Sequence, residues 1–143
     1  MKLLFRASTV AFLALTMVIV SSCSKYEEGS KFTLLTAKAR VTGDWKMTEL
    51  TVNGTAQDLS GSTFEVSIKK DDTYTATNSY TFGGSTNTTT DNGTWKFNDD
   101  KTELIMTDSD NDISTSTIVM LKNKMMKLKE VDGSTTTIIT LEQ

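Results

Sequence analysis

The chain of 143 residues contains no histidine, no proline and only one cysteine, Cys23. Zinc, copper and iron sites are built mainly from histidine and cysteine, and catalytic triads take their base or nucleophile from the same residues. The sequence therefore predicts no metal, no cofactor and no enzyme activity. Catalysis by carboxylates alone stays open, although no motif indicates it.

Basic residues are also scarce, with 15 Lys and Arg against 18 Asp and Glu. Phosphate backbones are bound by clustered basic side chains that displace counterions. The densest basic stretch, from Lys122 to Lys129, alternates with apolar residues, as on the solvent face of one strand. We therefore expect no nucleic-acid partner.

No apolar run is long enough to cross a membrane as a helix, which takes about 20 residues. The longest, from Val10 to Val20, follows Lys2 and Arg6 and ends in Ser21-Ser22-Cys23. A charged start, a short apolar stretch and small residues at the end are typical of a secretory signal peptide. We predict that residues 1–22 form this leader and are removed.

The end of the leader, Val20-Ser21-Ser22-Cys23, resembles the lipobox of bacterial lipoproteins. The resemblance implies cleavage before Cys23 and attachment of diacylglycerol to its thiol, so that the membrane is a partner through an N-terminal lipid. Two or three acyl chains together hold stably to a bilayer. An ordinary signal peptide cut nearby, leaving a free thiol, is the alternative.

Residues 23–33 have no hydrophobic pattern and are predicted to be a lipidated, flexible tether. Glu27-Glu28 resembles the surface-export signal of Bacteroidetes lipoproteins, and Ser24 after the cysteine resembles an outer-membrane sorting signal. These resemblances imply the bacterial outer membrane, with the domain facing either the periplasm or the cell surface.

Residues 34–143 are predicted to be one all-β domain, because short β-branched and aromatic runs alternate with Asn, Asp and Gly clusters. A short helix is expected within residues 32–40. Eight or nine antiparallel strands follow, which favours an up-and-down barrel, with a β-sandwich as the alternative.

Local signals refine this expectation. The apolar residues of 43–52 change face, which predicts a bulge near Thr48, and Asn53-Gly54 predicts a type I′ hairpin turn. The polar residues 83–92 are predicted to be a loop, and 108–112 a connection before a strand over 118–121.

Gly43-Asp44-Trp45-Lys46 resembles the glycine-x-tryptophan signature on the first strand of lipocalins. Together with the segments beginning at Phe64, Gly93 and Leu104, it makes residues 34–142 similar to the small lipocalin-like lipoproteins of Bacteroidetes. The resemblance implies a barrel that holds one small ligand or is filled by its own side chains.

We predict that a shared interior of core or cavity side chains comprises Trp45, Met47, Phe64, Val66, Tyr74, Tyr80, Trp95, Phe97, Met106 and Met120. Two functions follow from the resemblance. One is a binding module for a small apolar molecule, or for a glycan or peptide. The other is a non-catalytic structural or accessory subunit of a cell-envelope complex, with an envelope protein as partner and a filled barrel.

Overall fold

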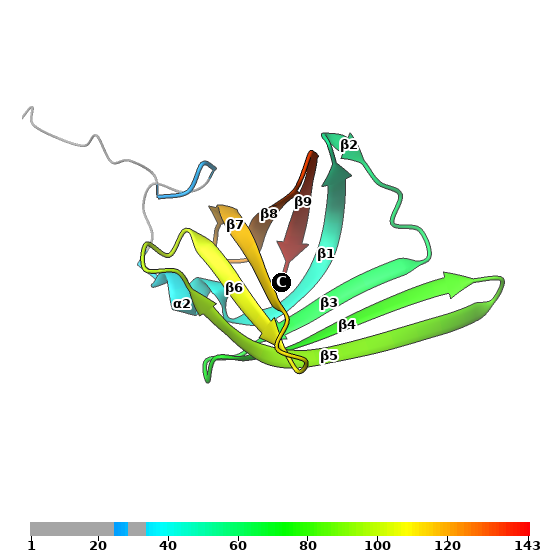
Figure 1. The fold of residues 1–143 in the computed structure, drawn as a ribbon, viewed down its shortest axis with the longest axis horizontal. Helices are drawn as coiled ribbons and strands as arrows, with labels where there is room; N and C mark the ends of the chain where they lie inside the picture. Colours follow the sequence, from blue (N-terminus) through cyan, green and yellow to red (C-terminus); the bar gives the residue numbers. More distant parts are fainter. Residues whose placement is uncertain (1–24, 29–33) are drawn as a thin grey trace, which may run out of the picture.

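The computed structural model describes residues 25–28 and 34–143 of the chain. Within these ranges one short helix, α2 (Ala37–Val41), precedes nine strands (Figure 1). The strands are β1 (Gly43–Val52), β2 (Thr55–Ala56), β3 (Ser62–Ile68), β4 (Thr73–Phe82), β5 (Ser85–Phe97), β6 (Glu103–Asp108), β7 (Ile113–Leu121), β8 (Met125–Asp132) and β9 (Thr135–Glu142).

The strands form one closed antiparallel barrel. Strands β3 to β9 pair in chain order, β1 pairs with β3, and β1 also pairs with β9, which closes the sheet. Strand β2 pairs only with the end of β1, so the barrel itself has eight strands. The predicted up-and-down barrel is confirmed, and closure excludes the sandwich.

Strand β1 has a bulge along its pairing with β9, and it pairs with both β3 and β9. Its first residues, Gly43 to Lys46, pair with β3, whereas Lys46 to Val52 pair with β9. The register against β9 shifts between Met47 and Glu49, so the bulge predicted at Thr48 is confirmed. An extra residue in one strand increases local twist, and here it carries β1 from one neighbour to the other.

The turn after β1 is the one that the sequence predicts. Asn53 has φ 49° and Gly54 has φ 77°, the positive values that both central residues of a type I′ turn require. The Asn53 side chain also accepts a hydrogen bond of 2.8 Å from the amide of Thr136, which ties this turn to β9.

The prediction of a polar loop over residues 83–92 is wrong. Gly83 and Gly84, both with positive φ, make a two-residue turn, and strand β5 begins at Ser85. Hydroxyl groups pair across the two strands, Ser79 with Thr88 and Thr81 with Thr86, each at 2.9 Å. Threonine is polar but β-branched, so it favours strands where cross-strand partners exist.

Strand β7 is longer than the sequence predicts, because it begins at Ile113 rather than at Ile118. Its first residues, Ile113 to Thr117, pair with β6. The preceding turn is closed by Asp108, whose Oδ1 accepts hydrogen bonds from the amides of Asp110 and Asp112 at 2.9 and 2.8 Å.

Strands β4 and β5 form a long hairpin, whose outer residues 77–90 we call the β4–β5 arm (Figure 1). The start of β3 pairs with residues 77–80 of the arm, and the hairpin extends beyond β3 and the other strands. Residues 73–90 contain no charged side chain. On the arm, the rings of Tyr80 and Phe82 lie parallel, with centroids 6.5 Å apart and exposures of 53 % and 75 %.

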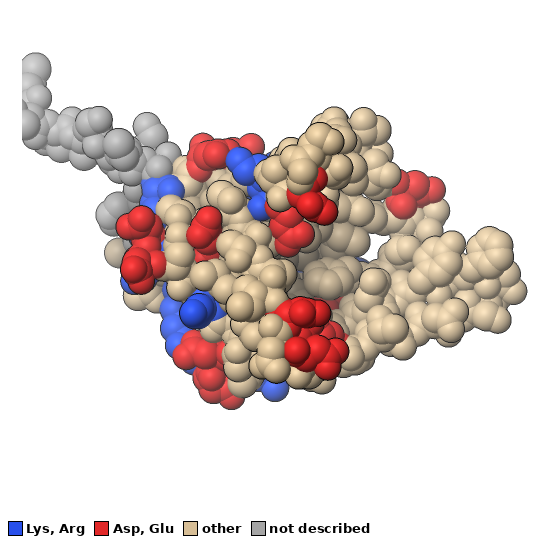
Figure 2. Space-filling view, in the orientation of Figure 1, with Lys and Arg blue, Asp and Glu red and all other residues tan. Residues whose placement is uncertain are grey.

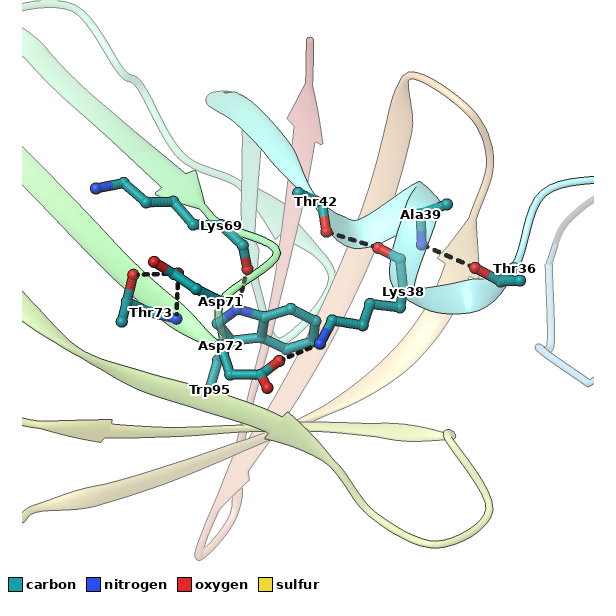
Figure 3. Close-up of polar contacts among 9 residues, drawn as sticks. All are labelled: Thr36, Lys38, Ala39, Thr42, Lys69, Asp71, Asp72, Thr73 and Trp95. Atoms are coloured by element: carbon teal, nitrogen blue, oxygen red, sulfur yellow. Dashed lines mark hydrogen bonds and ion pairs between the residues drawn. The ribbon is translucent and has the colours of Figure 1, made fainter.

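The opposite end of the barrel is closed by α2. Thr36 caps the helix by accepting a hydrogen bond of 3.1 Å from the amide of Ala39. Figure 3 shows how Lys38 then reaches the turn between β3 and β4, where it pairs with Asp72 at 2.6 Å. The same ammonium group lies 5.7 Å from the centre of the Trp95 ring, so one side chain links the helix to the β3–β4 turn and to β5.

Residues 25–28 do not behave as the predicted tether. The side chain of Tyr26 is 7 % exposed and belongs to the hydrophobic core. The amide of Glu28 donates a hydrogen bond of 2.8 Å to the carbonyl of Val119, as a parallel bridge on β7. The polar residues of this segment give no sign of the contact, which depends on the burial of a single aromatic side chain, Tyr26.

Candidate ligand cavity at the open end of the barrel

A cavity of about 190 Å³ lies inside the barrel at the end that carries the β4–β5 arm. Figure 2 shows the hollow, with acidic side chains on both sides of it. Its walls come from every strand between β3 and β9. The apolar lining consists of Phe64, Val66, Tyr74, Ala76, Met106, Leu128, Ile139 and Leu141, and the polar lining of Asp91, Ser114, Ser116 and Glu130.

The pairing register explains why these side chains share one interior. Val66 lies opposite Ala76, and Ala76 lies opposite Asp91, so three neighbouring strands present these residues to the same face. The small side chain of Ala76 leaves space where a larger residue would fill the wall.

The exposed fractions of the lining side chains show which of them lie deep in the cavity and which lie near its mouth. Leu141 is 1 % exposed, and Val66 and Leu128 are each 5 % exposed, so they form an apolar floor. Asp91 is exposed and Glu130 is half-buried, which places the two carboxylates toward solvent.

Tyr74 connects the floor to the mouth. Its hydroxyl donates a hydrogen bond of 3.2 Å to Oδ2 of Asp91. Burial and, secondly, the negative charge of Asp91 raise the pKa of Tyr74 to about 12, because both disfavour the phenolate. The hydroxyl therefore remains a hydrogen-bond donor throughout the physiological pH range.

A second polar pair lies on β7 and β8. The buried Ser116 donates a hydrogen bond of 2.6 Å to Oε1 of Glu130. Each carboxylate in the lining is thus held by one neutral hydroxyl.

Eight of the ten predicted interior residues fall into two groups. Phe64, Val66, Tyr74 and Met106 line the cavity. Trp45, Trp95, Phe97 and Met47 pack in or against the core.

The indole nitrogens of the two tryptophans both donate to backbone carbonyls. The Nε1 of Trp45 donates to the carbonyl of Val41 at 2.8 Å. The Nε1 of Trp95 donates to the carbonyl of Lys69 at 2.9 Å, as Figure 3 shows. Trp95 also meets Phe97 edge to face at 5.4 Å.

Tyr80 and Met120 lie apart from these groups. Tyr80 is exposed on the arm. Met120 is buried, but it pairs with Lys127 on β8 and with Glu28, beside the N-terminal segment, rather than joining the central cluster.

Sequence reasoning missed the polar part of the lining. Asp91 lay in the stretch predicted to be a loop, so it was assigned to no face. Glu130 follows Leu128 by two residues on one strand, and strict alternation would have placed it inside. Ser114 and Ser116 belong to the part of β7 that was not predicted.

Neither the lipobox residues Val20, Ser21 and Ser22 nor Cys23 lies within the described residues. In the part that is described, no helix is long and apolar enough to span a membrane. Nor do three or more acidic, histidine or cysteine side chains of residues 25–28 and 34–143 converge as metal ligands would.

Comparison with known proteins agrees with this geometry. The model of the lipocalin-like domain family matches residues 41–128, which is more than half of the chain. The chain belongs to the lipocalin-like domain family. Proteins with the lipocalin-like fold typically bind small hydrophobic ligands and are typically non-catalytic.

The lipocalin-like domain is similar to the solved structure of japanin from Rhipicephalus appendiculatus bound to cholesterol. The two are 13 % identical with a TM-score of 0.52, covering 76 % of this chain and 79 % of japanin. A second solved structure, odorant-binding protein OBP1, is 13 % identical with a TM-score of 0.47, covering 78 % and 76 %. No curated protein matches the sequence of this chain.

Proposed function

We propose that this chain is a lipid-anchored protein of the bacterial outer membrane whose barrel binds one small apolar molecule at its open end. The cavity of about 190 Å³ with an apolar floor carries the binding part of the proposal. An apolar cavity of about 150 Å³ is enough to bind benzene, whereas drug-sized ligands occupy about 300 Å³ or more. The ligand is therefore a single ring with a short chain, or an aliphatic molecule of similar size.

The leader and lipobox support the anchoring part. Cys23 precedes the buried Tyr26 by three residues, which span at most about 11 Å when extended. A lipid on Cys23 would thus hold the barrel close to the membrane, on the side of β7, with little freedom to move away.

Binding is tested with phenethyl alcohol, a neutral probe with one ring, by isothermal titration calorimetry. The wild-type domain should bind one molecule, and Ala76→Phe should abolish binding by filling the wall of the cavity. Ala56→Phe adds the same ring on the exposed strand β2 and should leave binding unchanged. Absence of binding to the wild type, or equal binding to Ala76→Phe, would contradict the proposal.

Anchoring is tested by fractionating cells that express the full chain. Cys23→Ala should block lipid attachment and release the protein from the membrane fraction. Protease treatment of intact cells then distinguishes the two faces, since only a surface-exposed domain is cleaved. Unchanged membrane association of Cys23→Ala would overturn the lipoprotein assignment.

The β4–β5 arm favours a second candidate, a non-catalytic accessory subunit that contacts an envelope protein, or a binder of glycan or peptide. Tyr80 and Phe82 are exposed on a surface without charge, which Figure 2 shows in a single colour. The two candidates are compared by expressing variants in cells that lack the chain and measuring whether the growth or envelope defect of those cells is restored. Restoration by Ala76→Phe but not by a Tyr80→Ser and Phe82→Ser variant would favour this role. The reverse result would favour the cavity.

A further inference from the structure

The charged groups in the cavity lining are all of one sign. Of the described residues that line it, Asp91 and Glu130 carry charge, and both are acidic. Each already accepts a hydrogen bond from a neutral hydroxyl, at 3.2 Å from Tyr74 and at 2.6 Å from Ser116. Hydroxyl groups satisfy part of the acceptor capacity of a carboxylate and leave its charge unbalanced.

Nearby lysines do not balance this charge. Lys127 and Lys129 lie on β8 beside Glu130, but alternation turns them to the outer side of the barrel. There they pair with Glu28 and Glu27 at 3.2 and 3.4 Å. On the other side of the mouth, residues 73–90 of the hairpin contain no charge of either sign.

We propose that the cavity selects a ligand with a positively charged head, such as an ammonium group, on a small apolar body, and rejects carboxylates of the same size. The inference rests on the proposed function, because it concerns the same cavity. The apolar floor around Leu141 takes the body, and the carboxylates nearer to solvent take the head. Low-dielectric walls concentrate the negative field at the mouth and strengthen this discrimination.

Three probes with the same phenylethyl body test the proposal by calorimetry: phenethylamine, phenethyl alcohol and phenylpropanoate. At low salt the ammonium probe should bind at least about ten-fold more tightly than the carboxylate, with the alcohol between them. Raising the ionic strength should reduce the difference between the charged probes and leave the alcohol unchanged.

Isosteric variants identify the groups responsible. Glu130→Gln and Asp91→Asn keep acceptors for Ser116 and Tyr74, and each should weaken phenethylamine roughly five-fold while changing phenethyl alcohol less than about two-fold. Asp100→Asn, an exposed residue in the turn between β5 and β6 at the closed end, is the control and should change neither probe.

The outcomes separate this inference from the proposed function. If the alcohol binds in the cavity but the amine binds no more tightly than the carboxylate, charge selection is wrong and the binding function stands. The same holds if Glu130→Gln and Asp91→Asn leave the amine unaffected. If none of the three probes binds, the proposed function itself fails.

Discussion

Tyr74 serves the core and the cavity at once. Its ring packs over Gly93 of the neighbouring strand, where a β-carbon would lie only 2.8 Å from the ring carbon Cε1. Its hydroxyl reaches Asp91 at the mouth. A single side chain therefore fixes the position of one cavity carboxylate relative to the barrel wall.

The raised pKa of Tyr74 makes stability depend on pH at the alkaline end. Between pH 10 and about 12, Tyr74 is deprotonated in the unfolded chain but still protonated in the folded one, so the free energy of unfolding falls as pH rises. Across this window the free energy of unfolding falls by on the order of 2 kcal/mol, because the folded barrel disfavours the phenolate. The pKa of Tyr26 is also raised by burial, so wild type must be compared with a variant.

Tyr74→Phe is that variant. Its stability should lie within about 1.5 kcal/mol of wild type at pH 7, because one hydrogen bond is lost. Denaturant titrations from pH 9 to 12 should show the wild type losing its advantage over Tyr74→Phe. A difference that stays constant across this range would show that the hydroxyl titrates normally.

Gly93 is predicted to tolerate no side chain. A β-carbon there would lie 2.0 Å from the carbonyl oxygen of Thr107 and 2.9 Å from the Cα of Asp108, both of which are backbone atoms. Gly93→Ala should therefore lower the free energy of unfolding by about 3 kcal/mol or more, measured by chemical denaturation.

Gly54→Asn is the matched control. Gly54 lies in the β1–β2 turn with open space around it, and asparagine adopts positive φ more readily than other residues. It should cost less than about 1 kcal/mol. Equal losses at the two positions would mean that loss of glycine itself, rather than the close approach of backbone, determines stability.

At the scale of elements, most strands could be predicted from the alternation of apolar and polar residues along the chain. The bulge near Thr48 and the turn at Asn53-Gly54 could be predicted because each depends on residues adjacent in the chain. Strand β5 could not, because the Thr and Asn residues of 85–92 are polar on both faces. Their strand pairing depends on β4 lying beside them, which is a tertiary contact.

The N-terminal segment gives a sharper example, and it can be tested. Tyr26 lies 5.6 Å from the guanidinium of Arg40, inside the core. Tyr26→Ala should lower the free energy of unfolding by roughly 2 to 4 kcal/mol, although its sequence context predicts a tether. Thermal or urea unfolding of the chain measures this loss.

Two controls separate burial from polarity in this segment. Tyr26→Phe keeps the ring and should cost less than about 1 kcal/mol. Glu27→Gln and Glu28→Gln remove ion pairs that are largely exposed, and each should cost less than about 0.5 kcal/mol. If Tyr26→Ala is as mild as these, the segment does not contribute to the core.

At the scale of the whole molecule, the barrel could be predicted but the cavity could not. An unbroken series of short antiparallel strands favours a barrel, and the pairing of β1 with β9 shows that the barrel closes. Empty volume depends on how side chains from seven strands meet, and a single small residue such as Ala76 changes it. The acidic character of the mouth was missed for the same reason, since Asp91 and Glu130 are distant in sequence and become neighbours of one cavity only in the closed barrel.

The central claim, that the open end of the barrel holds a small apolar ligand, is tested most directly by methyl NMR during titration with phenethyl alcohol. We predict saturable shifts at the methyl groups of Val66, Leu128, Ile139 and Leu141, and their loss in Ala76→Phe. Shifts confined to residues of the β4–β5 arm, or no saturable shifts at all, would contradict the account.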